Sequence, residues 1–530
     1  MQKIKKKMIV SILSLSLCWP SALFAASPSE GLRGTNGEIL SQVNSLAGSS
    51  EFGDRDGAAL SASFRNPASV AVASDGTIYI ADTDNQLIRK LKNGTVESFA
   101  GNTLLEDERG LPIGALLDGA GEASSFSKPH GLDVDARGNV YVADADNHAI
   151  RKITPNGTVT TLAGNGVLGD EDGRGKAAAF YSPTDVAVTA DGVVYVADTL
   201  NHAIRKITPD GTVTTLNAMA ERLMEWAPGY VESAGSFADG PLAEAAFNEP
   251  SGLALDERGN LYVSDTGNQL IRYIDLQNGT VSTVAGLVRN PMYQGSEPYA
   301  PGGYVNGAAL QAQFHSPRGI AVTAEGGLVI ADSMNHAIRY LHNGQVITLA
   351  GALEEKYGDQ NGINGLNRLH APSGVAVQRD GSILIADSYN NKVRVWSLYT
   401  HPEQVEANGS IHVVLNGQVV TFDAQPEIAN ARTMVPVRAI GEALGYEVEF
   451  EGTSVKLSLD DKSVTLQLDD TQIAIEAAGE EPNRRFMDVA PYAKDGRTYV
   501  PLRFFSEEFG MDVQWDADTR TAILREKMFD

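Results

Sequence analysis

A short pattern that ends in Asp-x-x-Asn, followed by an apolar-Arg pair, occurs six times in the chain. The first copy runs from Ile78 to Asp82 and continues through Asn85 to Arg89. The repeated aspartates are Asp82, Asp144, Asp198, Asp265, Asp332 and Asp387, and successive copies lie about 54 to 67 residues apart. A period of this length, built from short alternating strands, is typical of the blades of a β-propeller.

Each repeat contains signals for four short antiparallel strands. The first strand follows a proline three residues after an apolar residue, as in Phe64 to Pro67, and glycine turns separate later strands. One such blade cannot bury both of its faces, so six blades must pack around a central axis. The last repeat lacks a fourth strand after Trp396, whereas residues 41–48 have the missing pattern. We therefore expect residues 41–48 to complete blade six and close the ring, which removes an exposed sheet edge.

These motifs resemble those of the NHL-repeat family of six-bladed β-propellers, and the resemblance covers roughly residues 40–398. It implies an all-β six-bladed propeller. Known members of the family include binding scaffolds, and similar six-bladed propellers include lactonases and a metal-dependent lyase. The resemblance therefore leaves both binding and catalysis open.

The composition changes after Trp396, and residues 399–410 form a predicted linker to a second domain at residues 411–530. This segment contains a second duplication, in which a Val-Pro-x-Arg motif precedes a predicted short helix. The motifs begin at Val435 and Val500, and the helices end near Gly445 and Gly510. Each helix is followed by an alternating strand, which predicts a small α+β domain.

The second domain resembles the copper amine oxidase N-terminal-like domain, also called a stalk domain. The matching features are Asn416-Gly417, the two Val-Pro-x-Arg turns and Trp515-Asp516. The resemblance implies an extracellular or cell-envelope accessory module, common in Gram-positive bacteria. That module is not the copper-bearing domain of its family, and His412 stands alone here, so we expect no copper.

The N-terminus has the pattern of a secretory signal peptide at residues 1–26. Four lysines precede an apolar run from Met8 to Phe24, followed by Ala25-Ala26. The run is too short for a permanent membrane span and no later stretch qualifies, so we expect a secreted or envelope-associated protein without a transmembrane segment. The single cysteine, Cys18, lies inside the signal; a lipobox would need a small residue where Leu17 stands.

Two features of composition exclude classes of function. Loss of Cys18 with the signal excludes cysteine nucleophiles and thiolate metal sites. The formal net charge of −25 disfavours nucleic acid as a partner.

The residues after the strand-opening prolines are expected to surround one mouth of the channel. In order they are Ala68, His130, Thr184, Ser251, Arg318 and Ser373, and the next position carries Asp185 in the third blade. His130, Asp185 and Arg318 break the sixfold pattern. They could act as base, orienting carboxylate and anion holder. The alternative, which we favour, is a polar channel mouth that holds water.

The other polar motifs are interpreted as structural. The Asp-x-x-Asn motif and the Asn-His pairs recur around the ring, whereas a functional site should break the symmetry. The turns containing Asp54, Asp56, Asp170 and Asp172 resemble half of a calcium loop, without the full spacing and distal glutamate of an EF-hand. Asp-Gly turns explain these residues without calcium, so calcium is kept as an alternative and no other cofactor is expected.

The sequence therefore favours a secreted, noncatalytic binding scaffold over an enzyme. The propeller loops would bind an extracellular protein, a peptide or a cell-wall glycan, and the C-terminal module would engage the envelope. Long inserts at residues 102–117, 217–236 and 287–303 are expected on one face, where binding usually occurs. The alternative is a propeller hydrolase, lactonase or lyase that uses the channel mouth.

Overall fold

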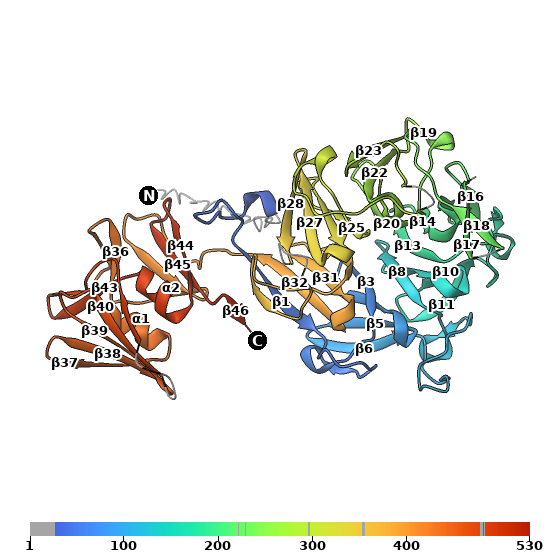
Figure 1. Cartoon of the computed structure of the whole chain (residues 1–530). Helices are drawn as coiled ribbons and strands as arrows, with labels where there is room; N and C mark the ends of the chain where they lie inside the picture. Colours follow the sequence, from blue (N-terminus) through green and yellow to red (C-terminus); the bar gives the residue numbers. More distant parts are fainter. Residues whose placement is uncertain are drawn as a thin grey trace, which may run out of the picture.

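The computed structural model describes residues 27–529, apart from 221, 228, 295–296, 352–355, 478–480 and 482. The expected signal peptide lies outside the described residues. Figure 1 shows a propeller of sheets arranged around an axis and a smaller domain beside it, which confirms the predicted fold class. Among the helices of the described segments, none has the length and apolar character needed to cross a membrane.

Five blades share one strand order, in which the first strand lies at the axis and a two-residue strand lies at the outer edge. Blade one contains β3 (Pro67–Val72), β4 (Ile78–Asp82), β5 (Leu87–Lys92), β6 (Thr95–Ala100) and β2 (Gly57–Ala58). Blade two contains β8 (Pro129–Val134), β9 (Val140–Asp144), β10 (Ala149–Ile153), β11 (Thr158–Ala163) and β7 (Gly119–Ala120). Blade three contains β13 (Pro183–Val188), β14 (Val194–Asp198), β15 (Ala203–Ile207), β16 (Thr212–Thr215) and β12 (Gly173–Arg174).

Blades four and five follow the same order. Blade four contains β20 (Pro250–Leu255), β21 (Leu261–Asp265), β22 (Leu270–Asp275), β23 (Thr280–Ala285) and β19 (Gly240–Pro241). Blade five contains β25 (Pro317–Val322), β26 (Leu328–Asp332), β27 (Ala337–His342), β28 (Gln345–Ala350) and β24 (Gly307–Ala308). In every blade, six included, a one-turn 3-10 helix joins the second and third strands: η3 (Thr83–Asn85), η5 (Ala145–Asn147), η7 (Thr199–Asn201), η9 (Thr266–Asn268), η11 (Ser333–Asn335) and η12 (Ser388–Asn390).

Blade six is assembled from three parts of the chain. Its inner strands are β30 (Pro372–Val377), β31 (Ile383–Asp387) and β32 (Lys392–Leu398), and β1 (Ser41–Ala47) from the N-terminal segment pairs antiparallel with β32. Outside β1 lies β29 (Asn361–Ile363), and β46 (Met528–Phe529) from the end of the second domain pairs with β29. Segments that precede and follow the propeller in the sequence thus both contribute strands to this sheet.

The propeller core lies between neighbouring blades. Phe64, which opens blade one, packs with Ile80 of its own blade and with Leu384 and Ala386 of blade six, and all four are fully buried. Successive apolar side chains of a strand point to opposite faces of the blade, so they pack alternately against the preceding and the following blade. Burial is therefore continuous around the ring.

Every blade also buries one arginine in a polar network, which explains the repeated motif. In blade one, Asp82 accepts hydrogen bonds from the backbone N–H of Arg65, from Asn85 and from the guanidinium of Arg89. The same guanidinium pairs with Asp56 at 2.6 Å and lies 5.3 Å from the ring centre of Phe64. The hairpin aspartates are therefore structural, and they bind the arginine as well as backbone N–H groups.

The C-terminal domain contains three small sheets and two short helices, α1 (Val437–Ala443) and α2 (Arg503–Phe509). The first sheet is β34 (Gln418–Val419), β33 (His412–Leu415), β45 (Thr521–Arg525) and β44 (Asp512–Asp516); the second is β35 (Glu427–Ala429), β36 (Arg432–Pro436), β43 (Arg497–Pro501) and β42 (Tyr492–Lys494). The third is β37 (Glu447–Glu451), β38 (Ser454–Leu459), β39 (Lys462–Gln467), β40 (Gln472–Ala477) and β41 (Asn483–Phe486). Phe504 and Phe505 of α2 are buried among these sheets with Ile440 of α1, so this domain has its own core.

Candidate binding site at the channel mouth

The first strands of all six blades line the central channel, which contains a cavity of about 290 Å³. Each strand begins at a proline that pairs with the hairpin aspartate, as Pro67 does with Asp82. One end of the channel is therefore surrounded by the strand starts and the hairpin turns. We call this end the hairpin mouth.

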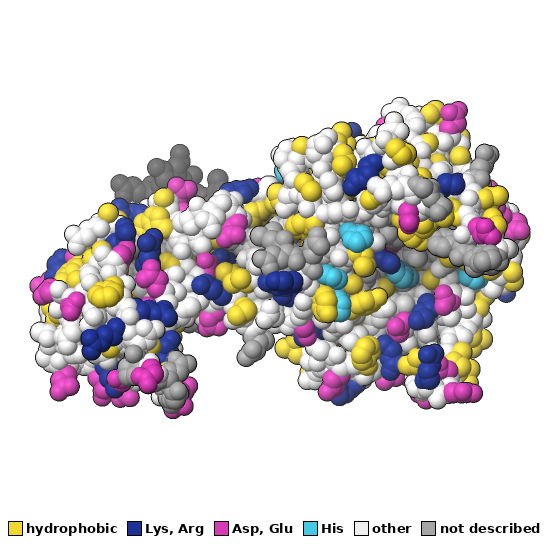
Figure 2. All heavy atoms as spheres, viewed as in Figure 1, with side chains coloured by type: hydrophobic (Ala, Val, Ile, Leu, Met, Phe, Trp, Pro, Cys, Tyr) yellow, Lys and Arg dark blue, Asp and Glu magenta, His cyan; other side chains and the backbone are white. Residues whose placement is uncertain are grey.

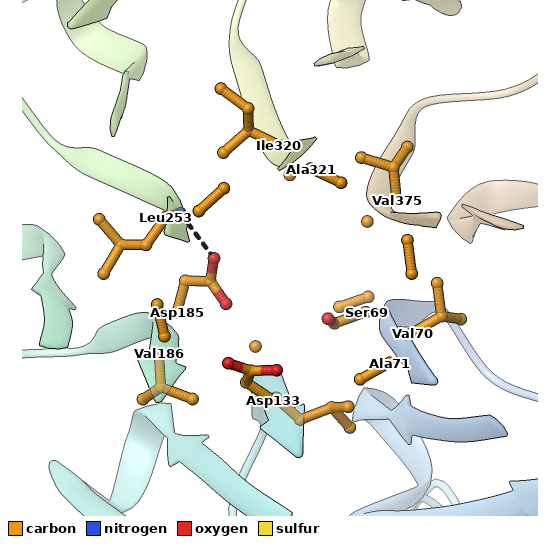
Figure 3. Close-up of a pocket in the computed structure, with 18 of the residues that line it drawn as sticks. Ser69, Val70, Ala71, Asp133, Asp185, Val186, Leu253, Ile320, Ala321 and Val375 are labelled. Carbon is orange, nitrogen blue, oxygen red and sulfur yellow. Dashed lines mark hydrogen bonds between the residues drawn. The ribbon is translucent and has the colours of Figure 1, made fainter. Parts of the chain in front are cut away.

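Two carboxylates project into the channel, as Figure 3 shows. Asp185 accepts a hydrogen bond of 2.8 Å from the backbone N–H of Leu253 in the next blade. Asp133 accepts bonds of 2.7 and 2.8 Å from the N–H groups of Val134 and Val188. Burial raises the pKa of Asp133 to about 6 and that of Asp185 to about 8, and the charge of Asp133 adds to the latter shift.

The sequence reasoning singled out Asp185 but missed Asp133. A signal was present, because the position of Asp133 carries alanine in the other blades, namely Ala71, Ala187, Ala254, Ala321 and Ala376. Room for the carboxylate of Asp185 depends on Gly131, where a Cβ would lie only 2.2 Å from Asp185 Oδ1. The glycine is therefore required by this close approach.

His130 lies at the channel wall but is not bonded to Asp185 in the described part of the chain. Its Nδ1 lies 2.9 Å from the carbonyl oxygen of Thr184. Burial lowers the pKa of His130 to about 4, with a smaller contribution from the positive charge of Arg318. His130 therefore stays neutral at pH 7, and in this structure Asp185 does not orient its ring.

Arg318 opens the innermost strand of blade five and is half-buried at the hairpin mouth. It makes no ion pair or hydrogen bond through its side chain with any residue that the structure describes. Burial lowers its pKa, and electrostatic interactions with Tyr389, Glu249 and Tyr299 oppose that shift. Glu249 accepts a hydrogen bond of 2.8 Å from the hydroxyl of Tyr299. Arg318 thus differs from the blade arginines, whose guanidinium groups are bonded to carboxylates.

Beside Arg318 lies a group of rings that we call the aromatic platform: His336, Tyr357, His370 and Tyr389. The rings of Tyr357 and His370 are stacked with centres 4.3 Å apart, and Tyr389 meets His370 edge-on at 5.1 Å. His336 contacts both Tyr357 and His370. Tyr357 and Tyr389 remain 64% and 61% exposed. Figure 2 shows histidine, basic and hydrophobic side chains gathered across this part of the molecule.

Two of the long inserts meet near the same mouth. The insert at 217–236 forms a hairpin of β17 (Arg222–Ala227) and β18 (Tyr230–Ala234). Arg222 lies 3.9 Å from the ring centre of Tyr293 and donates to the carbonyl oxygen of Pro298, both in the insert at 287–303. A second cavity of about 170 Å³ lies here between Tyr181, Glu249 and Tyr299.

Two of the weak calcium candidates belong to the arginine networks. Asp56 pairs with Arg89, and Asp172 pairs with Arg205 at 2.8 Å, while Asp54 accepts from Thr103. Among the described residues, no three His, Cys, Asp or Glu side chains gather closely enough to hold a metal ion. Calcium at Asp54, Asp56, Asp170 or Asp172 stays an alternative to structural Asp-Gly turns.

Comparison with protein families identifies the repeats. The NHL repeat model matches residues 64–91, 126–153, 180–207, 247–272 and 369–396, which belong to five of the six blades. The propeller is therefore built from NHL repeats. Residues 414–524 match the copper amine oxidase N-terminal domain. The chain thus combines an NHL-repeat propeller with a copper amine oxidase N-terminal domain, and both predicted resemblances are confirmed.

Curated relatives match part of the chain. Protein SUPPRESSOR OF QUENCHING 1, chloroplastic, of Arabidopsis thaliana is 32% identical over 52% of this chain and 26% of its own length. NHL repeat-containing protein 2 of Homo sapiens is 27% identical over 71% of this chain and 53% of its own. The chain therefore spans about a quarter to a half of the length of these relatives.

Two solved structures with a similar fold illustrate the range of similar propellers. One is an auxiliary nutrient binding protein from Bacteroides thetaiotaomicron, 13% identical, with a TM-score of 0.48 over 68% of this chain and 77% of its own. Another is a streptogramin B lyase, 14% identical, with a TM-score of 0.39 over 68% of this chain and 98% of its own. Similarity at this level says nothing about function.

Proposed function

We propose that this protein is a secreted or cell-envelope binding protein whose propeller holds a ligand at the hairpin mouth. The observation that carries the proposal is the aromatic platform, in which Tyr357 and Tyr389 stay exposed although rings stack beside them. Rings held by their neighbours lose little conformational freedom on binding, so they make effective contacts. The N-terminal signal pattern and the family of the C-terminal domain support an extracellular location, in a Gram-positive bacterium.

The test uses residues 27–530 and two preparations of extracellular polymer: purified cell-wall sacculi and surface proteins. We expect co-sedimentation with the sacculi, and loss of it in the double variant Tyr357→Ala, Tyr389→Ala. Phe486→Ala, which removes a 70% exposed ring from the C-terminal domain, is the matched control. Absence of binding to both preparations would contradict the proposal. Binding that survives the double variant would move the site elsewhere.

The alternative function is catalysis in the channel, and one observation favours it. Asp133 and Asp185 face a common cavity with separated, raised pKa values, which is a property of acid–base pairs in enzymes. Hydrolysis of lactones and elimination from cyclic esters are the reactions to assay. If the protein turned over such a substrate and the folded Asp185→Asn variant did not, the protein would be an enzyme and the binding proposal would be wrong. Turnover that persists in that variant would rule out this pair.

A further inference from the structure

Among the described residues, two guanidinium groups at the hairpin mouth lack a carboxylate partner: Arg65, whose Nε and Nη1 are buried without a hydrogen-bond partner, and Arg318. A half-buried guanidinium without a carboxylate partner loses hydration and gains no compensating bond. Arg318 is in this position, because the nearby Glu249 is bonded to Tyr299 rather than to Arg318. In a chain of net charge −25, a half-buried cation without a carboxylate partner marks a place where an anionic group of a ligand is favoured.

The planar guanidinium of Arg318 also favours a particular shape of anion. Arginine presents parallel N–H donors that match the two oxygens of a carboxylate. The carboxylate of Glu249 lies close to Arg318 and disfavours a second negative charge on the bound group. The site therefore suits a group with a single negative charge.

The aromatic platform continues outward from Arg318. The strand that carries Arg318 packs closely on β30 at Ser373, and the Ser373 hydroxyl bonds to that of Ser388, the residue before Tyr389. Tyr389 in turn contacts His370, so the platform begins next to Arg318. A sugar ring has one face of C–H groups that packs on such aromatic faces, and hydroxyl groups at its rim that bond to tyrosine and histidine. A peptide would need backbone partners, whereas the platform offers rings and side-chain polar groups.

We propose that the hairpin mouth binds a carboxylate-bearing glycan, with the carboxylate on Arg318 and a sugar ring on the aromatic platform. This inference rests on the proposed binding function and specifies its ligand class. Uronic acids and the lactyl ether of N-acetylmuramic acid both supply the required chemistry. The two sources are separated by the test.

The experiment is a glycan array probed with residues 27–530. Oligouronates and N-acetylmuramic-acid glycans are each paired with a methyl-esterified or carboxyl-reduced counterpart, and phosphodiester glycans and acidic peptides complete the panel. We expect binding to be confined to one or both classes of free carboxylate. Calorimetry with the strongest member then compares variants. Arg318→Gln should weaken binding at least about tenfold, the effect of losing a charge-assisted bond, and Arg318→Lys should weaken it less.

The control variant is Arg258→Gln, which changes the same charge in an exposed turn at the opposite end of a blade. Because Arg318 makes no bond with described residues, its variants should melt within about 1 °C of the parent. Equal binding of esterified and free glycans, or unchanged affinity in Arg318→Gln, would overturn the inference and leave the proposed function standing. Binding only to phosphodiester glycans or to acidic peptides would also overturn it. If the protein bound neither the sacculi nor the surface proteins, the proposed function itself would be contradicted.

Discussion

At the scale of single residues, the repeated motif separates stability from function. Asp265 accepts from the N–H of Asn248, from Asn268 and from Arg272, and it is fully buried. The opposite side of the same guanidinium pairs with Asp239, which is partly exposed. The buried partner should therefore matter far more than the exposed one.

Asp265→Ala is expected to lower the free energy of unfolding by about 3–5 kcal/mol, because it leaves a buried guanidinium short of its partner. Asp239→Asn is the matched control, since blade five carries Asn306 at the equivalent position and bonds Arg339 through it. The control should cost less than about 1 kcal/mol. Urea unfolding measures both. Equal losses would show that burial does not decide the effect.

The channel carboxylates predict a pH dependence of stability. The folded state raises the pKa of Asp185 to about 8, whereas an unfolded aspartate titrates near 3.9. The folded state thus keeps a proton that the unfolded state has released, so stability falls as the pH rises between about 4 and 8. The neighbouring carboxylate, Asp133, acts in the same direction up to about pH 6.

Asp185→Asn keeps an oxygen for the N–H of Leu253 but removes the titration. We expect it to stabilise the protein at pH 8 by at least about 1.4 kcal/mol, the equivalent of one pKa unit. At pH 4 the two proteins should melt together. Thermal melts across this range measure the effect, with Asp191→Asn in an exposed turn as control. A variant with the parent's pH profile would contradict the prediction.

At the scale of elements, neighbouring blades are joined by a repeated side-chain bond. The residue that ends each hairpin helix has a positive φ and accepts the backbone N–H of the residue before the next blade's opening proline. The acceptors are Gln86, His148, His202, Gln269, His336 and Asn391. Sequence reasoning interpreted the histidines as turn residues and missed this link between blades.

An accepting Nδ1 must be unprotonated, so the histidine links are sensitive to acid. Burial lowers the pKa of His202 to about 4, and Arg222 acts in the same direction while the carbonyl oxygen of Ser233 opposes. Stability from this link is complete above the unfolded pKa near 6.5 and is lost as the pH falls towards 4. The link partner is the N–H of Glu249 at 3.0 Å.

His202→Gln should keep the link, because Gln86 and Gln269 perform the same role in other blades. At pH 7.5 its melting temperature should match the parent, and at pH 5 it should exceed the parent by several degrees, about 1–2 kcal/mol. His315→Gln, at an exposed site, is the control. If both variants lose stability equally in acid, the link is not the cause.

At the scale of the whole molecule, blade six depends on the N-terminal segment. Val43 and Ala47 of β1 are fully buried, and Ser45 accepts from the buried guanidinium of Arg394. Deleting residues 27–48 exposes the edge of β32 and removes these contacts. We expect the melting temperature to fall by at least about 3 °C, a loss above roughly 2 kcal/mol. Differential scanning calorimetry measures it, and an unchanged profile would contradict ring closure.

The two domains also share contacts. The N–H of Ile363 donates to the carbonyl oxygen of Lys527, beside the pairing of β46 with β29, and Gln514 accepts from the N–H of Thr35. We still expect 27–400 and 408–530 to unfold cooperatively as separate chains, because each has its own core. Each should melt a few degrees below its transition in the full chain, a loss of about 1 kcal/mol. A C-terminal fragment that stays unfolded would place the boundary elsewhere.

Much of this architecture follows from local patterns. The alternating strands, the Phe-x-x-Pro starts and the Gly turns repeat with one period, and repetition allowed the blades and the second domain to be predicted. Asp185 and Arg318 were found because they break that repetition. Asp133 breaks it too, four residues after the opening proline, where the other five blades carry alanine.

The aromatic platform could not be predicted in this way. Tyr357 lies in a connection and Tyr389 in the hairpin of blade six, and neither recurs around the ring; His370, in the turn that opens blade six, shares its position with His315 of blade five. Their proximity depends on how two blades pack and where the connection between them returns. The sequence by itself therefore determined the blades, because periodic burial is a local property of each strand. The tertiary structure alone decided which polar and aromatic side chains meet at the mouth, and that Arg318 is left unpaired among them, because closing the ring sets the distances between separate blades.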